Sequence, residues 1–283
     1  IISGAIIAVI FFLGFFLGSV AFKILIGAVA ILAYKEIITL PKVKDKLNLL
    51  IIILGLISFM ALIYIVNDGY ALYLGVSYQT IALLLFVMVI PTIFSKKYDT
   101  ETSLFMFTLL FLLGMALNSM IMLDSINKWI LLYVITVICA TDVFALFIGS
   151  YVGIHKLSSI SPNKTIEGSL GGVVCASIIG TFYYLAVIGN TSVLRIILMS
   201  ILISVFGQIG DLFFSKIKRE NKIKDYSNLI KGHGGILDRI DSLVFGVLVY
   251  TLLCTILYIE KRVFMWLISI IVLILMLGVL VLL

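Results

Sequence analysis

Long apolar runs follow one another along almost the whole chain, and they limit the folds that it can adopt. The runs fall at roughly 1–18, 20–39, 48–66, 71–94, 103–122, 128–150, 169–189, 193–214, 240–259 and 263–283. An apolar helix of about 20 residues is long enough to cross the hydrocarbon core of a bilayer. With 63% hydrophobic and 12% charged residues, the composition excludes a soluble globular domain. We therefore predict an all-α, polytopic transmembrane protein with about nine or ten spans.

Turn-forming and polar residues separate these runs and suggest how the chain is organised. Residues 1–122 are expected to form N-terminal transmembrane helices. Residues 123–262 are expected to form the catalytic helices, with polar loops at 151–168 and 215–239. Residues 263–283 form a last apolar helix, which either spans the membrane or lies outside the common core. Because the first residue is Ile1 and not Met, we expect a few residues to precede it in the full protein.

The distribution of basic residues predicts the orientation of the chain. If the N-terminus is cytoplasmic and the spans alternate, the inward-facing connections carry 15 of the 20 basic residues. An excess of Lys and Arg on the cytoplasmic side is typical of integral membrane proteins. Both polar loops then face the cytoplasm and are expected to border one polar cavity. We predict an integral protein of the cytoplasmic membrane of a prokaryote, with its active site facing the cytoplasm.

The most polar stretch of the chain is residues 215–241, between two apolar runs. It holds seven of the 20 basic residues and four of the 14 acidic ones. Basic residues come first, a glycine-rich turn around His233 follows, and Asp238 and Asp241 come as the next apolar run begins. The two aspartates are three residues apart and therefore share one face of a helix. Two carboxylates beside a cluster of cations indicate a divalent metal that binds a phosphate-rich substrate.

This stretch resembles the signature of the phosphatidate cytidylyltransferases, also called CDP-diacylglycerol synthases. Lys231 stands where the family usually has Pro, a departure that loosens the turn before His233 but removes no proposed ligand. The positions that fit are Ser215, Lys218, Arg219, Lys224, Asp225, Ser227, Ile230, His233, Gly234, Gly235, Asp238, Arg239 and Asp241.

The loop at 151–168 contains a second segment that looks like the same family, in Ser161-Pro162-x-Lys164-Thr165-x-Glu167-Gly168-Ser169. The resemblance makes these polar residues substrate-binding candidates. A cation, hydroxyl groups and a helix start together suit a phosphate, because all three supply positive charge or hydrogen-bond donors. The structural alternative is a capped turn at the start of a helix.

Acidic residues within or next to apolar runs are the metal-ligand candidates, because a charge in a membrane helix is costly without a functional partner. The resemblance implies that Asp211 and Asp238 hold the metal, with Asp241 in support. Asp142 is a candidate second carboxylate, or a ligand of a second cation. Structural alternatives remain open: an interfacial bond for Asp211, an arginine salt bridge for Asp241 and a hydrogen bond between helices for Asp142.

Five further residues of the signature are candidates for catalysis or substrate binding. Lys218 and Arg219 are expected to act in catalysis, and Lys224 and Arg239 to bind substrate phosphates. His233 is either a general base, since its unperturbed pKa lies near neutrality, or a residue that binds phosphate or fixes the glycine turn. The basic run is also expected to touch anionic lipid.

The resemblance implies an enzyme that transfers a cytidylyl group from CTP to phosphatidate, forming CDP-diacylglycerol and pyrophosphate. It implies Mg²⁺ as the cofactor, allows a second cation and implies a homodimer in contact with membrane lipid. No nucleic-acid partner is expected. The alternative hypothesis is an ion- or proton-coupled transporter that uses Asp142 and Asp211, since intramembrane acids alone fit that function equally well.

Overall fold

The structure is a computed structural model, which describes residues 13–65, 76–189, 192–229 and 234–259. Within these ranges the chain is helical and contains no β-strand; Lys156 and Thr165 form an isolated bridge. The prediction of an all-α fold is therefore confirmed. The runs at 1–18 and 263–283 lie largely or wholly outside the described residues.

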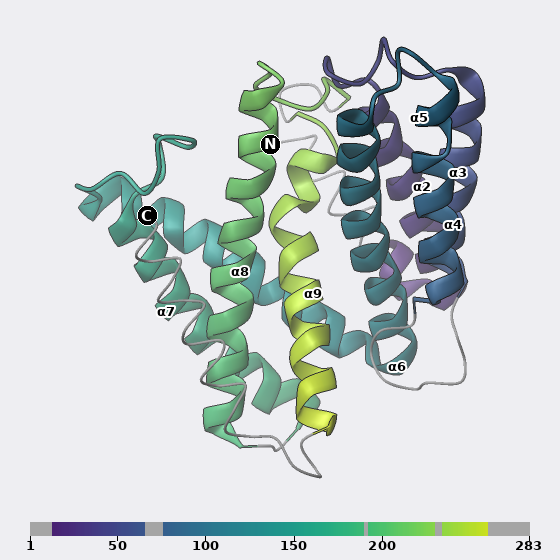
Figure 1. The fold of residues 1–283 in the computed structure, drawn as a ribbon. Coiled ribbons are helices and arrows are strands. Elements are labelled where there is room, and N and C mark those ends of the chain that lie inside the picture. Colours follow the sequence, from purple (N-terminus) through teal and green to yellow (C-terminus); the bar gives the residue numbers. More distant parts are fainter. Residues whose placement is uncertain (1–12, 66–75, 190–191, 230–233, 260–283) are drawn as a thin grey trace.

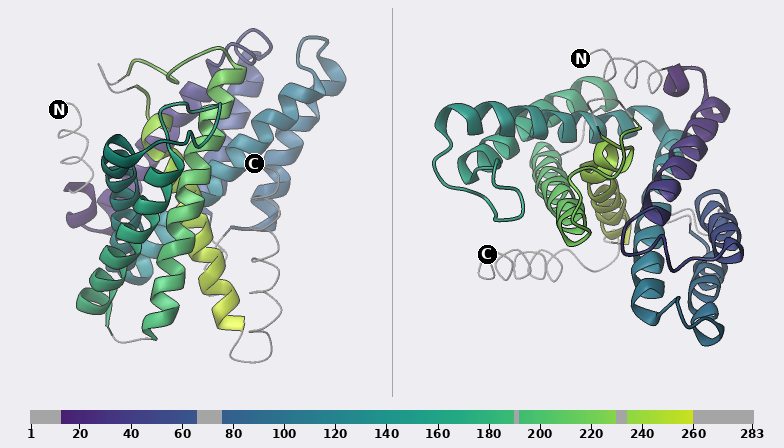
Figure 2. Two further views of the ribbon diagram at one scale, coloured as in Figure 1. Left: turned by 90° about the vertical axis from the view of Figure 1, so that its left-hand side faces the viewer. Right: turned by 90° about the horizontal axis from the view of Figure 1, so that it is seen from above.

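The N-terminal part of the described chain consists of α2 (Ser19–Ile38), α3 (Leu49–Tyr64), α4 (Tyr78–Val89) and the short α5 (Pro91–Phe94). The long helix α6 (Thr100–Val152) follows, and then α7 (Ile166–Tyr183), which ends in a π-helical turn, η1 (Tyr184–Ile188). The last described helices are α8 (Val193–Glu220) and α9 (Leu237–Ile259). Figures 1 and 2 show α2, α3 and α4 grouped beside the first half of α6, while α8 and α9 lie against its second half.

Helix α6 joins two runs that the sequence separated. The separation expected near Asp124 is present, because α6 consists of two helical segments that meet at a kink at Asn127. Asn127 has φ −161° and ψ 105°, and its side-chain oxygen accepts a hydrogen bond from the Trp129 amide at 3.0 Å. An asparagine can start a new helical segment in this way, because its side chain satisfies an amide that the kink leaves without a backbone partner.

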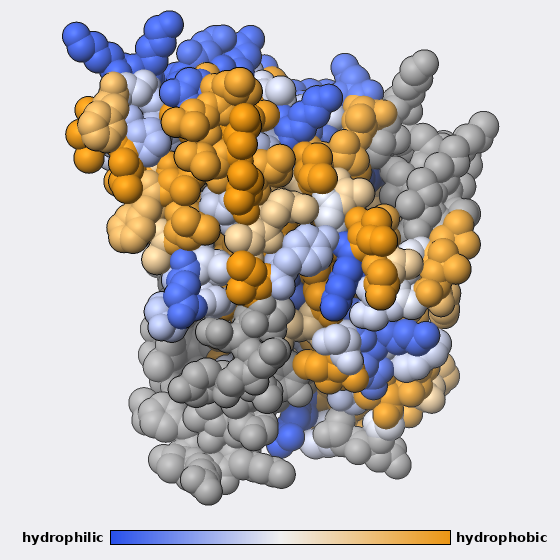
Figure 3. Space-filling view, turned by 90° about the vertical axis from the view of Figure 1, so that its right-hand side faces the viewer, coloured by the Kyte–Doolittle hydropathy of each residue, from blue (hydrophilic) through white to orange (hydrophobic). Residues whose placement is uncertain are grey.

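In the described chain, four helical segments are long and apolar enough to cross a membrane: α6, Ile166–Ile188, α8 and Leu237–Ile256 of α9. Helices Leu49–Tyr64 and Tyr78–Phe94 are apolar but shorter. The count of nine or ten spans stays a prediction. Many large apolar side chains of these helices face outward, and Figure 3 shows them over α3 and α4 below a hydrophilic rim. An apolar surface of this extent suits lipid better than water.

One connected cluster of buried apolar side chains links the N-terminal helices to α8 and α9. Its members come from every long helix of the described chain, for example Phe22, Phe59, Leu84, Leu113, Ala176, Ile203 and Val247. All three cysteines are free thiols, as their isolated positions in apolar runs predicted.

Candidate functional site

A pocket of about 410 Å³ lies where α6, the loop before α7 and α8 meet. It brings together six residues that the sequence singled out: Asp142, Ser161, Lys164, Thr165, Ser169 and Asp211. They come from the polar loop and from three apolar helices, α6, α7 and α8, and Asp142 and Asp211 are 69 residues apart in the sequence. The remaining lining is mainly small or apolar, with Gln208, Asn163 and Ser150 as further polar groups. The shape and lining suit a small polar ligand.

An ion pair between Lys164 and Asp211 joins the loop before α7 to α8 across this pocket. Both side chains are only partly exposed, and Asp211 also accepts a hydrogen bond from the Ser215 hydroxyl at 3.3 Å. The sequence had placed Lys164 and Asp211 in different roles, phosphate binding and metal binding. Their direct contact places the lysine of the loop before α7 beside a carboxylate of α8.

Two further carboxylates, Asp142 and Asp241, approach each other through Ser242. The Ser242 hydroxyl donates to Asp142 at 3.3 Å, while the Ser242 amide donates to Asp241 at 2.8 Å. Asp241 is only 8% exposed, and both Asp142 and Asp211 are near enough for their negative charges to repel it. Three carboxylates, from α6, α8 and α9, therefore lie near enough to one another for their charges to interact.

Asp238, the other aspartate of the signature, has different partners. Its oxygens accept hydrogen bonds from Lys218 Nζ at 2.6 Å and from the amides of Tyr226 and Gly235, each at 2.9 Å. Asp238 does not line the pocket. Within the described residues, no three His, Cys, Asp or Glu side chains converge as a ready-made metal site. Asp211 and Asp238, which the sequence paired as metal ligands, thus bind two different lysines.

The Tyr226 phenol packs beside this second aspartate. Its hydroxyl donates to the Phe214 carbonyl at 3.0 Å, and the Lys218 ammonium lies 5.6 Å from the centre of its ring. Burial, together with the charges of Asp238, Asp241 and Glu36, raises the pKa of Tyr226. Tyr226 therefore remains a neutral donor that fastens the signature loop to α8.

Three candidates around the start of α7 make hydrogen bonds that stabilise the loop before it. The Thr165 hydroxyl accepts the Gly168 amide at 3.1 Å and so caps α7. Glu167 contacts His155 Nδ1 at 2.5 Å and accepts the amides of Ile154 and His155. Ser169 donates to the Gln208 side chain at 2.5 Å, which ties the start of α7 to α8. The capped turn left open by the sequence is therefore present, on the edge of the pocket.

Three basic candidates of the signature, Arg219, Lys224 and Arg239, are exposed and lie outside the pocket lining. Arg219 donates to the Ile223 carbonyl at 3.3 Å, at the end of α8. The prediction for His233 lies outside the described residues.

Sequence reasoning missed Glu36, near the C-terminal end of α2. Its buried carboxylate accepts hydrogen bonds from the Ser227 hydroxyl and from the amides of Ile236 and Leu237. The signal that could have identified it is an acidic residue inside the apolar run at 20–39, where a charge is costly without partners.

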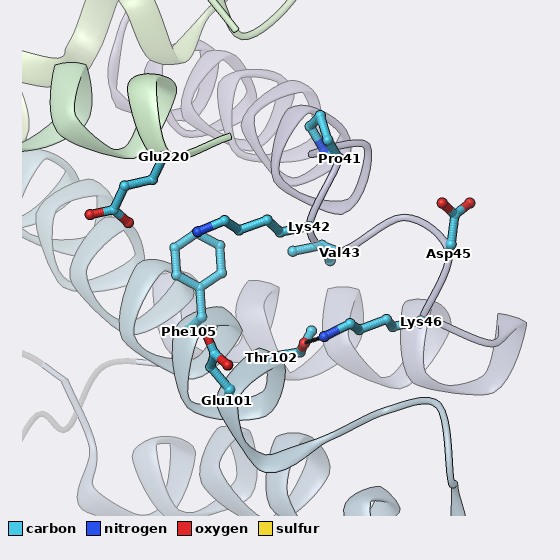
Figure 4. Close-up of a pocket in the computed structure, with 9 residues that line it drawn as sticks. All are labelled: Pro41, Lys42, Val43, Asp45, Lys46, Glu101, Thr102, Phe105 and Glu220. Atoms are coloured by element: carbon cyan, nitrogen blue, oxygen red, sulfur yellow. Dashed lines mark hydrogen bonds between the residues drawn. The ribbon is translucent and has the colours of Figure 1, made fainter. Parts of the chain in front are cut away.

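A second pocket, of about 360 Å³, lies between the α2–α3 connection, the start of α6 and the end of α8 (Figure 4). Its charged lining residues are Lys42, Asp45, Lys46, Glu101 and Glu220. Lys46 is already engaged, because its ammonium contacts Asp99 at 2.6 Å and Thr102 at 2.9 Å. None of the residues predicted for chemistry lines this pocket.

Comparisons with known proteins agree with the signature. The sequence matches the profile of the Cytidylyltransferase family over residues 1–257. It is 34% identical over 254 residues to a phosphatidate cytidylyltransferase of Bacillus subtilis, with 87% of this chain and 93% of that protein covered. Proteins of the same name from Staphylococcus haemolyticus (32% over 246 residues) and Staphylococcus aureus (33% over 249 residues) each match 85% of this chain and 93% of their own length.

These relatives are named as transferases, so the alternative of an ion- or proton-coupled transporter is not supported. The match also extends over nearly all of the described helices, well beyond the two motifs. This chain belongs to the phosphatidate cytidylyltransferase family.

Proposed function

We propose that this protein transfers a cytidylyl group from CTP to phosphatidate, giving CDP-diacylglycerol and pyrophosphate. Membership of the family and the names of the relatives support this reaction. The observation that carries it within the structure is the meeting of Lys164 and Asp211 in a polar pocket between apolar helices. A site of this kind can take a charged nucleotide beside a lipid substrate, because polar groups line the pocket and apolar side chains surround it.

In the proposed reaction, a phosphate oxygen of phosphatidate attacks the α-phosphorus of CTP. A new P–O bond forms, the bond from the α-phosphorus to the oxygen bridging to the β-phosphate breaks, and pyrophosphate leaves with that electron pair. Such a displacement needs positioned groups that stabilise phosphate charge more than it needs a strong base. The phosphate monoester of the lipid is largely ionised near neutral pH, so general-base help from His233 is not required.

Lys164 and the neighbouring hydroxyl groups are proposed to hold the phosphates. The Lys164 ammonium would exchange part of its contact with Asp211 for a phosphate oxygen. Ser161 would donate a hydrogen bond from the same pocket wall, and Ser169 would turn its hydroxyl from Gln208 to the phosphate. Thr165 and Glu167 would support them by keeping the loop closed. Lys218, Arg219, Lys224 and Arg239 are proposed to attract the triphosphate or the lipid phosphate to the signature end of the site.

We also propose that Mg²⁺ binds among the carboxylates, with Asp211, Asp241 and Asp142 as the principal ligands. Carboxylate oxygens are the donors that this hard cation prefers, and Asp142 and Asp241 lie near enough to Asp211 for their charges to interact. Bound there, the ion would offset negative charge on the phosphates. Asp238 is a fourth candidate, less favoured because its oxygens already accept three hydrogen bonds. A second cation could share the same carboxylates.

The proposed location is the cytoplasmic membrane of a prokaryote, with the pocket open to the cytoplasm and the protein acting as a homodimer. The apolar helices and the bacterial relatives support a membrane location. The basic α2–α3 and α8–α9 connections lie together, since the Lys42 amide donates to the Asn221 side chain at 3.2 Å. Clustered basic connections are typical of the cytoplasmic face.

The test uses the purified protein in detergent with phosphatidate, labelled CTP and Mg²⁺. We expect the parent to form CDP-lipid and pyrophosphate in equal amounts, and Asp211→Asn to lose about a hundredfold or more in kcat. Asp99→Asn is the matched control, because Asp99 also pairs with a lysine but does not line the pocket. The proposal fails if no nucleotide yields a CDP-lipid product, or if Asp211→Asn and Asp99→Asn have equal activity.

A further inference from the structure

Glu36 places a buried carboxylate from α2 against the signature loop, about 200 residues further along the chain. Glu36 is only 4% exposed. Oε1 accepts the Ser227 hydroxyl at 2.6 Å and the Ile236 amide at 2.8 Å, and Oε2 accepts the Leu237 amide at 2.8 Å. A buried acid with three donors directed at its two oxygens has a specific partner and is not a residue left over in an apolar run.

The two amides that Glu36 accepts lie at the start of α9, which begins at Leu237. The first amides of a helix have no partner within the helix, and a side chain of the same segment usually accepts them. Here the acceptor comes from another helix. A carboxylate at this position is also favoured by the partial positive charge at a helix N-terminus. Glu36 therefore supplies the acceptors for the amides at the start of α9.

Gly235 shows how closely Glu36 approaches the turn. A Cβ atom at Gly235 would lie 2.4 Å from Glu36 Oε1 and 2.7 Å from Oε2. Real Cβ atoms do not come this close to other heavy atoms, so a side chain at position 235 would displace the Glu36 carboxylate from its present place. The Gly235 amide points instead to Asp238 Oδ2 at 2.9 Å. Glu36 and Asp238 together accept the amides of three consecutive residues, Gly235, Ile236 and Leu237.

The position of α9 matters because its first two turns carry both aspartates of the signature. Asp238 faces Lys218, and Asp241 lies near Asp211 and Asp142. A shift in the start of α9 would move both carboxylates relative to α8. Without Glu36, the amides of Ile236 and Leu237 would need water or another acceptor, and the turn before α9 would lose its contact with α2.

We propose that Glu36 is a positioning residue for the transfer reaction, which fixes the start of α9 and with it Asp238 and Asp241. The competing interpretation is that these amides are an anion site that a substrate phosphate occupies after displacing Glu36, because consecutive free amides can bind phosphate. The two differ in what removal of the carboxylate does. The positioning role predicts loss of order and of cation binding, whereas the competing role predicts tighter binding of phosphate.

The inference rests on the proposed function only for its activity measurement. The first measurement is therefore hydrogen exchange of the full-length protein in detergent without substrate, followed in peptides that cover residues 226–240. Losing a hydrogen bond to a charged acceptor corresponds to about a tenfold change in an opening equilibrium. We expect exchange at Ile236 and Leu237 to be about tenfold faster in Glu36→Ala than in the parent, with Glu36→Gln between the two.

The second measurement is the Mg²⁺ concentration that gives half-maximal activity. We expect it to rise about fivefold or more in Glu36→Ala, because displaced carboxylates bind the cation less well. Glu36→Gln should recover part of this loss, since it keeps one acceptor oxygen. Tyr34→Phe is the control: Tyr34 is a buried residue of the same helix, and its hydroxyl donates to the Ile52 carbonyl of α3 at 2.7 Å instead of to the signature loop. The Tyr34→Phe variant should lose some stability but keep the parent's exchange at Ile236 and Leu237 and the parent's Mg²⁺ requirement.

Two results would overturn the proposal. One is that Glu36→Ala matches Tyr34→Phe in both exchange and Mg²⁺ requirement, which would reduce Glu36 to a packing residue. The other is that Glu36→Ala binds inorganic pyrophosphate more tightly than the parent, which would identify the amides as an anion site. If the parent itself makes no CDP-lipid, the proposed reaction fails, whereas the exchange measurement still tests the position of α9.

Discussion

The ammonium nitrogen of Lys218 lies 2.6 Å from Oδ1 of Asp238, and the two side chains are 11% and 7% exposed. This buried ion pair joins the last turns of α8 to the first turn of α9. Both residues belong to the 215–241 signature, so one polar motif forms its own link between two helices. Lys218 also lies near enough to Asp241 for its positive charge to favour that carboxylate.

Lys218→Met should lower the free energy of unfolding by about 3 kcal/mol, because removal of one partner leaves the other charge buried and uncompensated. Denaturation in mixed micelles measures this change. The double variant Lys218→Met, Asp238→Asn should recover part of the loss, since neither buried charge remains. If the double variant is as unstable as the sum of its single changes, the two residues do not act as a pair.

Gly207 and Gly210, one turn apart on α8, should respond differently to alanine. A Cβ at Gly210 would lie 2.7 Å from the Asp241 carbonyl and 2.9 Å from Phe245, whereas at Gly207 the nearest atom is 3.5 Å away. Gly210→Ala must therefore push α9 from α8 and displace Asp241. We expect it to lose about tenfold or more in kcat/KM, because small displacements of positioned groups have large effects on rate.

Gly207→Ala is the matched control for this prediction. The substitution meets only ordinary van der Waals contacts and replaces a glycine in a helix, which favours the folded state by up to about 1 kcal/mol. We expect parent-like kcat/KM and an unfolding temperature that is equal or higher. Similar activity of the two alanine variants would mean that the close approach at Gly210 has no functional consequence.

The sequence allowed the all-α class and the two polar motifs to be predicted because both signals are local. Apolar runs of about twenty residues specify helices by length alone, and the order of residues in 215–241 identifies the family. The position of Lys164 beside Asp211 was not predictable in the same way. The loop of Lys164 and the loop that follows α8 were expected on one side of the membrane. The contact itself depends on how α7 packs against α8.

The exact residue of the kink in α6 and the role of Glu36 could not be predicted, for physical reasons. A connection was expected near Asp124 and lies at Asn127, because several polar residues close together leave the point of the break undetermined. Glu36 contacts residues that lie 191 to 201 positions away. No spacing along the sequence carries that relationship, because it arises only when α2 packs beside the signature loop.

Tyr226 provides a prediction about pH. Since burial and nearby carboxylates raise its pKa, the neutral form is favoured in the folded state. Its contribution to stability should be complete below about pH 10, the ordinary pKa of tyrosine in an unfolded chain, and should decline as pH rises above that value. Tyr226→Phe should lower stability by about 1 kcal/mol at pH 7, because the bond to the Phe214 carbonyl is lost.

The corresponding measurements are unfolding midpoints and kcat/KM for the parent and Tyr226→Phe between pH 7 and about pH 9.5, below the ordinary tyrosine pKa. The two activity profiles should run parallel over this range, since the phenol does not ionise. A titration step in the parent that the variant lacks would contradict the neutral state of Tyr226.

Thr165 distinguishes a capping role from direct binding of substrate. Its hydroxyl accepts the Gly168 amide at 3.1 Å and also lines the pocket. Thr165→Val should cost about 1 kcal/mol of stability, because the N-cap acceptor of α7 is lost, while Thr165→Ser should keep it. If capping is the whole role, the KM values for CTP and phosphatidate stay at the parent level in both variants once the fraction of folded enzyme is taken into account. A rise in KM for CTP in Thr165→Val alone would mean that the hydroxyl also binds the nucleotide, since valine retains the shape of the side chain without the donor.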